Sequence, residues 1–203
     1  MSQPSAERPI FWIFAGPNGS GKSSLYEDAN IQDFGRSVWI INPDRLTLRV
    51  QAVEGLSHHD ANLAAVQRME AWVEASIRAH QTVGVETVLS TDKYRRLVSE
   101  AKKLGFEIRL IYIMLDTAER SVERVRLRVK KGGHTVPEDK IVDRRRRSLE
   151  QLPWFLDQAD RAWLFDNSKA SPREMGRKAD GVIILDPDAL PEMVSAVRSI
   201  ESN

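Results

Sequence analysis

The chain of 203 residues contains no cysteine, so it can form neither a disulfide bond nor a metal site with thiolate ligands. It also has no apolar run near the roughly 18 residues that span a bilayer. Its first residues, MSQPSAERP, lack the charged-then-apolar order of a signal peptide. These absences argue against a disulfide-rich secreted protein and against a membrane partner, and we expect the protein to be cytoplasmic.

The four histidines are scattered without the spacing of metal ligands, so we expect no metal site built by histidine side chains. Internal repeats, low-complexity tracts and obvious linkers are absent as well. A chain of this length without linkers predicts a single domain over residues 1–203. Its hydrophobic content of 41% and charged content of 29% are typical of a globular protein.

One stretch, Ile10 to Leu25, joins an apolar run to a glycine-rich motif. Residues 10–14 predict a buried strand, and residues 16–23 (GPNGSGKS) fit the P-loop pattern G-x-x-x-x-G-K-S/T, with a helix expected from Lys22. In such a loop, backbone N–H groups surround phosphate, the lysine reaches the β- and γ-phosphates, and the serine ligates Mg²⁺. We therefore predict binding of a nucleoside triphosphate with Mg²⁺. The residues predicted to bind it are Gly16, Pro17, Asn18, Gly19, Ser20, Gly21, Lys22, Ser23 and Ser24, with Ser23 as the metal ligand.

Apolar and amphipathic stretches alternate along the rest of the chain. Further strands are predicted at residues 37–41, 82–85, 108–115, 161–165 and 181–185. Helices are predicted at residues 45–54, 60–80 (N-cap Asp60), 91–104, 117–131, 137–152 (ended by Pro153) and 190–200. The helix at residues 60–80 is expected to bury Leu63, Val66, Val73 and Ile77. The helix at residues 117–131 is expected to bury Ala118, Val122, Val125 and Val129. The alternation predicts an α/β fold of the P-loop NTPase and kinase type, a mostly parallel sheet with helices on both faces.

Acidic residues follow three of the predicted strands, at the sheet edge where ligands bind in open α/β sheets. Asp44 is the leading candidate for a base that accepts the proton of an acceptor hydroxyl, and the less favoured alternative is a turn or N-cap aspartate. Glu86, followed by Thr87, could bind the acceptor or a metal-bound water, or be an exposed strand-end carboxylate. Asp116 could hold Mg²⁺ through water or cap the helix that follows.

Residues 117–147 contain 11 Lys or Arg and 5 Asp or Glu, a local charge of +6 in a chain whose net charge is +1. Arg124 and Arg128 stand one helical turn apart. Residues 144–147 are four consecutive arginines that step about 100° each, so at least one must point to the buried side of its helix. Because guanidinium groups match phosphate oxygens, we predict an arginine-rich helical lid that closes over the triphosphate. The alternative is a solvated basic surface.

Nucleic acid is another polyanion that a basic segment can bind. This segment has no interleaved aromatic residues for base stacking and no recognisable reading motif. We therefore predict no nucleic-acid partner.

Four motifs occur in order along the chain: GPNGSGKSS at residues 16–24, INPD at 41–44, ETVLS at 86–90, and RVKKGGHTVPEDKIVDRRRRS at 128–148. Together they resemble the zeta toxin family of P-loop kinases, and the resemblance covers about three quarters of the chain. The segment GGHxVP followed by I-x-x-R-x-x-R is the most specific of the four.

This resemblance implies an ATP-dependent phosphotransferase that moves the γ-phosphoryl group of ATP to a sugar hydroxyl of a nucleotide sugar. In the best known members the acceptor is the 3′-hydroxyl of the sugar in UDP-N-acetylglucosamine, and the product poisons cell-wall synthesis. The resemblance implies that Lys22 and Ser23 hold phosphate and Mg²⁺ and that Asp44 is the base. It further implies that Glu86 and Thr87 face the acceptor. Two arginines, Arg128 and Arg144, would clamp phosphates.

One position departs from the family pattern, because members often carry a second threonine after Glu-Thr where this chain has Val88. That residue tends to face the acceptor sugar, so the acceptor is the least defined part of the prediction. The first strand begins almost at once, so we expect no fused antitoxin domain and a separate antitoxin protein as the inhibitor. Two other functions fit the motifs: a housekeeping kinase with another small-molecule acceptor, and a regulatory ATPase that needs neither Asp44 nor Glu86.

Overall fold

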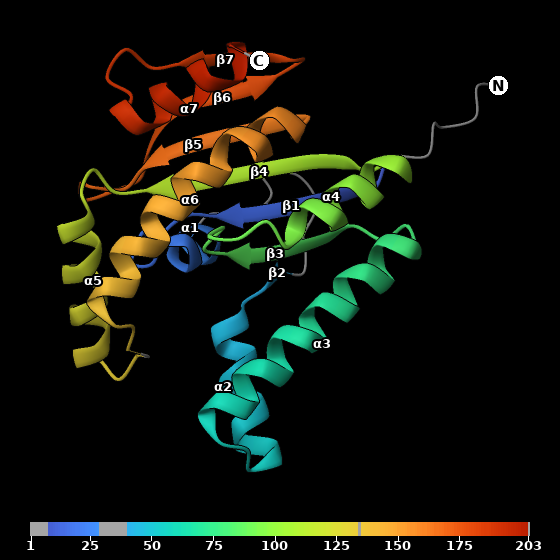
Figure 1. Ribbon diagram of the computed structural model, residues 1–203, viewed down its shortest axis with the longest axis vertical. Helices are drawn as coiled ribbons and strands as arrows, with labels where there is room; N and C mark the ends of the chain where they lie inside the picture. Colours follow the sequence, from blue (N-terminus) through green and yellow to red (C-terminus); the bar gives the residue numbers. More distant parts are fainter. Residues whose placement is uncertain (1–7, 29–39, 134, 203) are drawn as a thin grey trace.

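The computed structural model describes residues 8–28, 40–133 and 135–202, and a seven-stranded sheet forms its centre (Figure 1). The strands are β1 (Ile10–Ala15), β2 (Ile40–Ile41), β3 (Val83–Thr87), β4 (Glu107–Met114), β5 (Arg161–Asp166), β6 (Arg173–Ala179) and β7 (Val182–Leu185). Their order is β2-β3-β1-β4-β5-β6-β7, in which the first five are parallel, β6 pairs antiparallel with β5, and β7 pairs antiparallel with β6. The predicted mostly parallel sheet is therefore confirmed.

The helices are α1 (Lys22–Asp28), α2 (Pro43–Glu54), α3 (His58–Arg78), α4 (Tyr94–Lys103), α5 (Ala118–Lys130), α6 (Glu138–Gln158) and α7 (Pro191–Glu201). Buried side chains of α3, α4, α6 and α7 share one core with the residues of the sheet that face them. On the opposite face, Leu25 of α1 packs against the cluster that contains Trp12 and Phe14. Helices thus cover both faces, as predicted (Figure 1).

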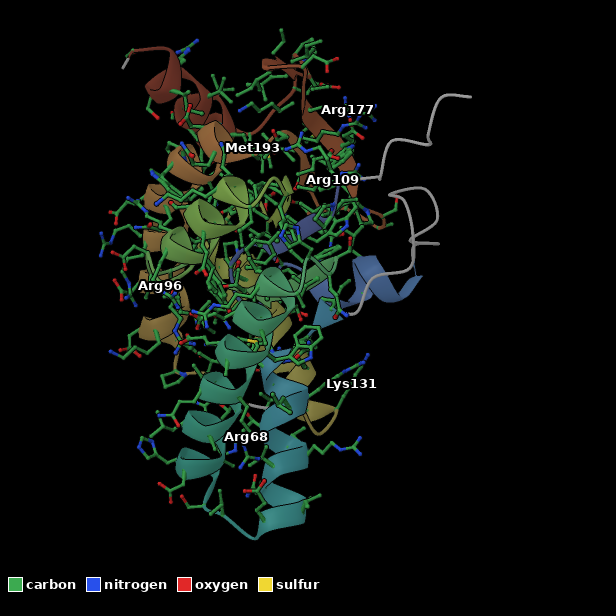
Figure 2. The ribbon with its side chains drawn as sticks, turned by 90° about the vertical axis from the view of Figure 1, so that its right-hand side faces the viewer. Arg68, Arg96, Arg109, Lys131, Arg177 and Met193 are labelled. Carbon is green, nitrogen blue, oxygen red and sulfur yellow. The ribbon has the colours of Figure 1, made fainter. Side chains whose placement is uncertain are left out.

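Helices α2 and α3 form a hairpin that extends beyond the sheet (Figure 1). Figure 2 shows this hairpin, marked by Arg68, at one end of the molecule and β6, marked by Arg177, at the other. No helix in the described ranges is long and apolar enough to cross a membrane. The assignment of residues 1–203 to one domain stays a prediction.

Strand β4 is a buried central strand of the sheet, next to β1. Its sequence EIRLIYIM is apolar over nearly its whole length, and the residues from Leu110 to Leu115 are all buried because helices cover both faces. β1 lies between β3 and β4, and Ala15 pairs with Thr87 and Tyr112. Parallel strands end at the same edge, so the segments after β1, β2 and β3 come together there.

Helix α6 is longer than predicted, because it continues through Pro153 instead of ending there. A proline inside a helix loses one backbone hydrogen bond and costs about 3 kcal/mol. Leu152, Phe155 and Leu156, on both sides of Pro153, are buried in the main core. Burial of three such side chains contributes about 1.5–3 kcal/mol each, which outweighs the cost of the proline.

Strand β6 was not predicted, because its sequence REMGRKA carries four charged side chains and no apolar alternation. It pairs with β5 and β7 and buries Met175, Gly176 and Lys178. The buried Lys178 donates from Nζ to the carbonyl oxygens of Leu156 and Asp157, both at 2.8 Å. These carbonyls lie in the last turn of α6, where a positive charge is favourable. A lysine can therefore occupy a buried strand position at which the strand pattern predicts an apolar residue.

Some predicted helix details were wrong. Ser57, and not Asp60, caps α3, and its side chain accepts a hydrogen bond from the backbone N–H of Asp60. Leu63 is 52% exposed, since it stands about 200° around the helix from Ala61, which begins the buried stripe. Val129, in the last turn of α5, is 37% exposed, whereas Val122 and Val125 are buried. Within the predicted strand 37–41, residues 37–39 lie outside the described ranges.

Candidate functional site

The P-loop connects β1 to α1, and the backbone of its glycines fixes its shape. Gly16, Gly19 and Gly21 have φ angles of 146°, 76° and 92°, which side-chain-bearing residues rarely adopt. A Cβ atom on Gly21 would lie 2.3 Å from Nδ2 of Asn167, and one on Gly19 would lie 2.6 Å from the backbone oxygen of Ser121. Positions 19 and 21 therefore require glycine, because a Cβ atom there would clash with atoms of neighbouring segments.

Lys22 is the first residue of α1 and is buried. Its Nζ donates to the carbonyl oxygens of Gly16 at 2.7 Å and Pro17 at 3.1 Å, so the side chain folds back over the loop. Burial lowers the pKa of Lys22 from its usual range. The negative charges of Glu86 and Asp44 oppose this shift, and the positive charge of Arg128 reinforces it. The hydrogen bonds of this buried ammonium go to neutral carbonyl oxygens, so a bound phosphate would offer it a charged acceptor at the site.

Asn167, which follows β5, supports the P-loop from outside the motif. Its Nδ2 donates to the carbonyl oxygen of Ser20 at 2.8 Å, and its own carbonyl accepts from Arg124 at 2.7 Å. The loop is thus tied to the end of β5 and to the lid helix α5. The predictions assigned no role to Asn167, and it lies 147 residues from Ser20 in the sequence.

Three polar side chains meet beside the P-loop where β2 and β3 end. The hydroxyl of Ser23 donates to Oε2 of Glu86 at 3.0 Å, and Nδ2 of Asn42 donates to the same carboxylate oxygen at 2.8 Å. Nδ2 of Asn42 also lies 3.2 Å from Oγ of Ser23. The predicted metal ligand and the predicted acceptor-side glutamate are therefore in direct contact. Asn42, to which no role was assigned, joins them.

Asp44 lies in the first turn of α2, not in a turn before it, because Asn42 is the N-cap and Pro43 begins the helix. Its side chain is exposed and lines a cavity of about 180 Å³. Lys22, Glu86, Thr87, Val88, Arg128 and Arg144 line this cavity from the sheet side and the lid, and Thr47, Leu48, His58 and Asn62 line it from α2 and α3. We call it the acceptor cavity. All the residues predicted to be catalytic or to bind the acceptor lie around it.

A second cavity, of about 460 Å³, adjoins the first at the P-loop lysine. Its lining includes Ser23, Ser24, Arg124, Lys131 and Asn167. We call it the nucleotide cavity. The two cavities share the lining residues Gly19, Lys22, Glu86 and Arg128. A group bound at these residues would therefore be in contact with both cavities.

Of the four consecutive arginines, Arg144 lines the acceptor cavity. Arg145 is buried and points to the core side, where it donates to the carbonyl oxygen of Leu115 at 3.0 Å and to Glu192 at 2.9 Å. Arg146 and Arg147 both form ion pairs with Asp143, at 2.9 Å and 3.0 Å. The helical period alone does not separate these roles, which depend on the rotation of α6, whereas the resemblance to zeta toxins implies Arg144 for the phosphate contact.

Two predicted residues have contacts that differ from expectation. The hydroxyl of Thr87 accepts a hydrogen bond from the backbone N–H of Leu89 at 3.0 Å, so it stabilises a turn as well as lining the acceptor cavity. Asp116 neither caps α5 nor lines the two cavities: Thr117 is the N-cap, and Asp116 pairs with Nε of Arg120 at 2.9 Å. The roles of the other predicted site residues stay predictions.

The residues present fit a phosphate group with Mg²⁺. Glycines shape a loop around a buried lysine, and the hydroxyl of Ser23 with the carboxylate of Glu86 provides the oxygen ligands that Mg²⁺ prefers. In residues 8–28, 40–133 and 135–202 no group of three or more His, Asp or Glu is arranged to hold a metal alone.

The fold and the loop define a P-loop nucleotide-binding protein with the sheet arrangement of small kinases. A family model described as an AAA domain matches residues 11–152, and the chain belongs to this family. An uncharacterized protein from Haemophilus influenzae is 29% identical over 130 residues, which make up 63% of this chain and 86% of that protein.

Two solved structures show the same fold. The AvrRxo1-ORF1:-ORF2 complex, whose structure contains ATP, matches with a TM-score of 0.66 at 16% identity, over 89% of this chain and 61% of that chain. The chain therefore spans about three fifths of that AvrRxo1 chain. The PezAT chromosomal toxin-antitoxin system of Streptococcus pneumoniae matches with a TM-score of 0.64 at 16% identity, over 98% of this chain and 87% of that chain. At the level of the fold, these similarities agree with the resemblance to zeta toxins.

Proposed function

We propose that this protein is an ATP-dependent phosphotransferase of the zeta toxin type, which transfers the γ-phosphoryl group to a hydroxyl of a nucleotide sugar such as UDP-N-acetylglucosamine. The observation that carries the proposal is the meeting of the nucleotide and acceptor cavities at Lys22, Glu86 and Arg128. A γ-phosphate at these residues is in contact with cations on one side and open to an acceptor on the other. That is the geometry which in-line phosphoryl transfer requires.

In the proposed reaction, Asp44 accepts the proton of the acceptor hydroxyl, whose oxygen forms a bond to the γ-phosphorus while the bond to the leaving ADP breaks. Lys22, Arg128 and Arg144 stabilise the negative charge on the transferred group. Mg²⁺, when bound, adds charge neutralisation at the phosphates. Ser23 and Glu86 are the residues that would hold it.

The nature of the acceptor is inferred from three features. The motifs resemble those of sugar-nucleotide kinases, and the acceptor cavity carries Arg128 and Arg144, which can bind phosphates of the acceptor as well as of ATP. The wall from α2 and α3 adds the neutral polar groups Thr47 and Asn62 and the apolar Leu48. Such a mixed wall suits an uncharged sugar or base better than a second anion.

A separate antitoxin protein is the proposed partner. Both similar structures belong to pairs of proteins, a toxin-antitoxin system in one case and an ORF1:ORF2 complex in the other. A protein that covers the nucleotide cavity would block ATP and so suppress the activity. The proposed location is the cytoplasm, where ATP and nucleotide sugars are available.

Mass spectrometry of reactions with the protein, Mg-ATP and a panel of UDP-sugars tests this proposal. We expect the gain of one phosphoryl group on UDP-N-acetylglucosamine, which disappears when Mg²⁺ is chelated. Consumption of ATP without any phosphorylated sugar nucleotide would refute the UDP-sugar assignment. Other hydroxyl-bearing metabolites would then be tested, since a housekeeping kinase with another acceptor is the alternative that the same cavity allows.

We predict that Arg144→Ala lowers kcat/KM about 10–100-fold, because a charge-assisted contact to phosphate contributes about 1.5–3 kcal/mol. Arg146→Ala is the matched control: this arginine pairs with Asp143 and Glu150, away from the acceptor cavity, and its loss leaves the rate unchanged. Steady-state kinetics of both variants are measured with Mg-ATP and the acceptor that mass spectrometry identifies as a substrate. Equal losses in the two would show that Arg144 contributes only to the general positive charge of the lid.

A further inference from the structure

Asn42 contacts the three parts of the candidate site at once. It directly follows β2, and because Ile41 pairs with Val85 in the parallel sheet, Asn42 lies beside Glu86 at the ends of these strands. Its Nδ2 donates to Glu86 at 2.8 Å and to Ser23 at 3.2 Å. Its Oδ1 accepts the backbone N–H of Arg45 at 3.1 Å and so caps α2, which carries Asp44.

The orientation of the amide follows from these partners. A backbone N–H can only donate, so the atom that faces Arg45 must be the carbonyl oxygen of the side chain. The NH₂ group then faces the carboxylate of Glu86, which can only accept when it is ionised. Each hydrogen bond fixes the other, and rotation of the amide by 180° would break both.

We propose that Asn42 is a positioning residue that couples the metal-binding side of the site to the acceptor side. Through Nδ2 it holds the Glu86 carboxylate against Ser23, and through Oδ1 it fixes the start of α2 and therefore the place of Asp44. Asparagine suits both roles because its side chain is a donor and an acceptor at this length. Serine and aspartate cap helices equally well. Serine is too short to reach Glu86 from the cap position, and an ionised aspartate has no donor.

This difference between residue types separates the two roles experimentally. In Asn42→Ser the cap of α2 is kept and the hydrogen bond to Glu86 is lost. We expect an unchanged Tm and a kcat that falls about 10–100-fold, the usual effect of removing a group that orients a metal ligand. Asn42→Ala loses both contacts, so its Tm also falls by about 2–4 °C, as is typical for the loss of a helix cap in a chain of this size.

Ser57→Ala is the matched control, since it removes the N-cap of α3, which lies outside the P-loop cluster. We expect it to lower Tm as Asn42→Ala does and to leave the Mg²⁺ dependence of ATP binding unchanged, because α3 lines the acceptor cavity, through His58 and Asn62, and not the nucleotide cavity. A double variant tests the route of the effect. Because Asn42 acts on the metal side through Glu86, Asn42→Ser combined with Glu86→Gln should have a kcat no lower than Glu86→Gln alone.

The effect on kcat rests on the proposed function, so a second measurement is independent of the acceptor. Titration calorimetry of ATP with and without Mg²⁺ should show that Mg²⁺ tightens ATP binding in the wild type and about 10–100-fold less in Asn42→Ser. Absence of any phosphorylated acceptor would refute the proposed function alone. Wild-type kcat and wild-type Mg²⁺ dependence in Asn42→Ser would refute the positioning role, and so would additive losses in the double variant.

Discussion

Asp44→Ala is expected to lower kcat by about 10²–10⁴-fold, which corresponds to about 3–5 kcal/mol of activation free energy. The physical reason is that a base within the acceptor cavity removes the proton of the acceptor hydroxyl as the new bond to phosphorus forms. ATP binding should persist, because Asp44 lines the acceptor cavity and not the nucleotide cavity. Rapid-quench kinetics for the chemical step, with calorimetry for ATP, measure the two effects separately.

Glu119→Ala is the matched control for the loss of a carboxylate. Glu119, like Asp44, is exposed in the first turn of a helix, but it belongs to α5 and lines neither cavity. Its removal costs the same favourable interaction with the helix dipole and leaves kcat unchanged. A regulatory ATPase does not need a base at Asp44, so equal activity of Asp44→Ala and Glu119→Ala would favour that class of protein over a kinase.

The parts of the site that lie in continuous motifs could be predicted from the sequence. Residues 16–23 specify the loop because glycine is required by local backbone geometry, and a parallel sheet necessarily brings residues 44 and 86 to the same edge. The placement of Asp44 inside α2 could not be predicted as readily. Asn42 and Asp44 are both good caps, and the hydrogen bond from the backbone N–H of Arg45 to Oδ1 of Asn42, with Pro43 as the first helical residue, decides for Asn42.

The supports of the site were harder to predict, because they depend on contacts between distant segments. Asn167 supports the P-loop across most of the length of the chain, and no local pattern distinguishes it from any asparagine after a strand. The same holds for Arg145, whose partners are carbonyl oxygens after β4 and Glu192 of α7. The rotation of α6, set by the burial of Leu152 and Phe155, decides which arginine enters the cavity.

Gly16→Ala is expected to destabilise the fold by about 2–6 kcal/mol, the largest stability effect of a single methyl group in the P-loop. Gly16 has a φ of 146°, and an added Cβ would lie 1.9 Å from the backbone oxygen of Ile113 in β4. The backbone strain costs about 1–3 kcal/mol, and forcing two central strands apart costs about 1–3 kcal/mol more. Because proteins are stable by only about 5–15 kcal/mol, much of the stability would be lost.

Gly55→Ala separates the two terms of this prediction. Gly55, after α2, has a φ of 66°, but an added Cβ there meets nothing within 4 Å, so only backbone strain of about 1–2 kcal/mol is introduced. Urea unfolding of both variants gives the free energies of unfolding. A larger loss for Gly16→Ala means that the loop is held in place by its contact with β4, so the phosphate-binding geometry depends on the pairing of β1 with β4. Equal losses would mean that the loop can shift away from Ile113 at little cost.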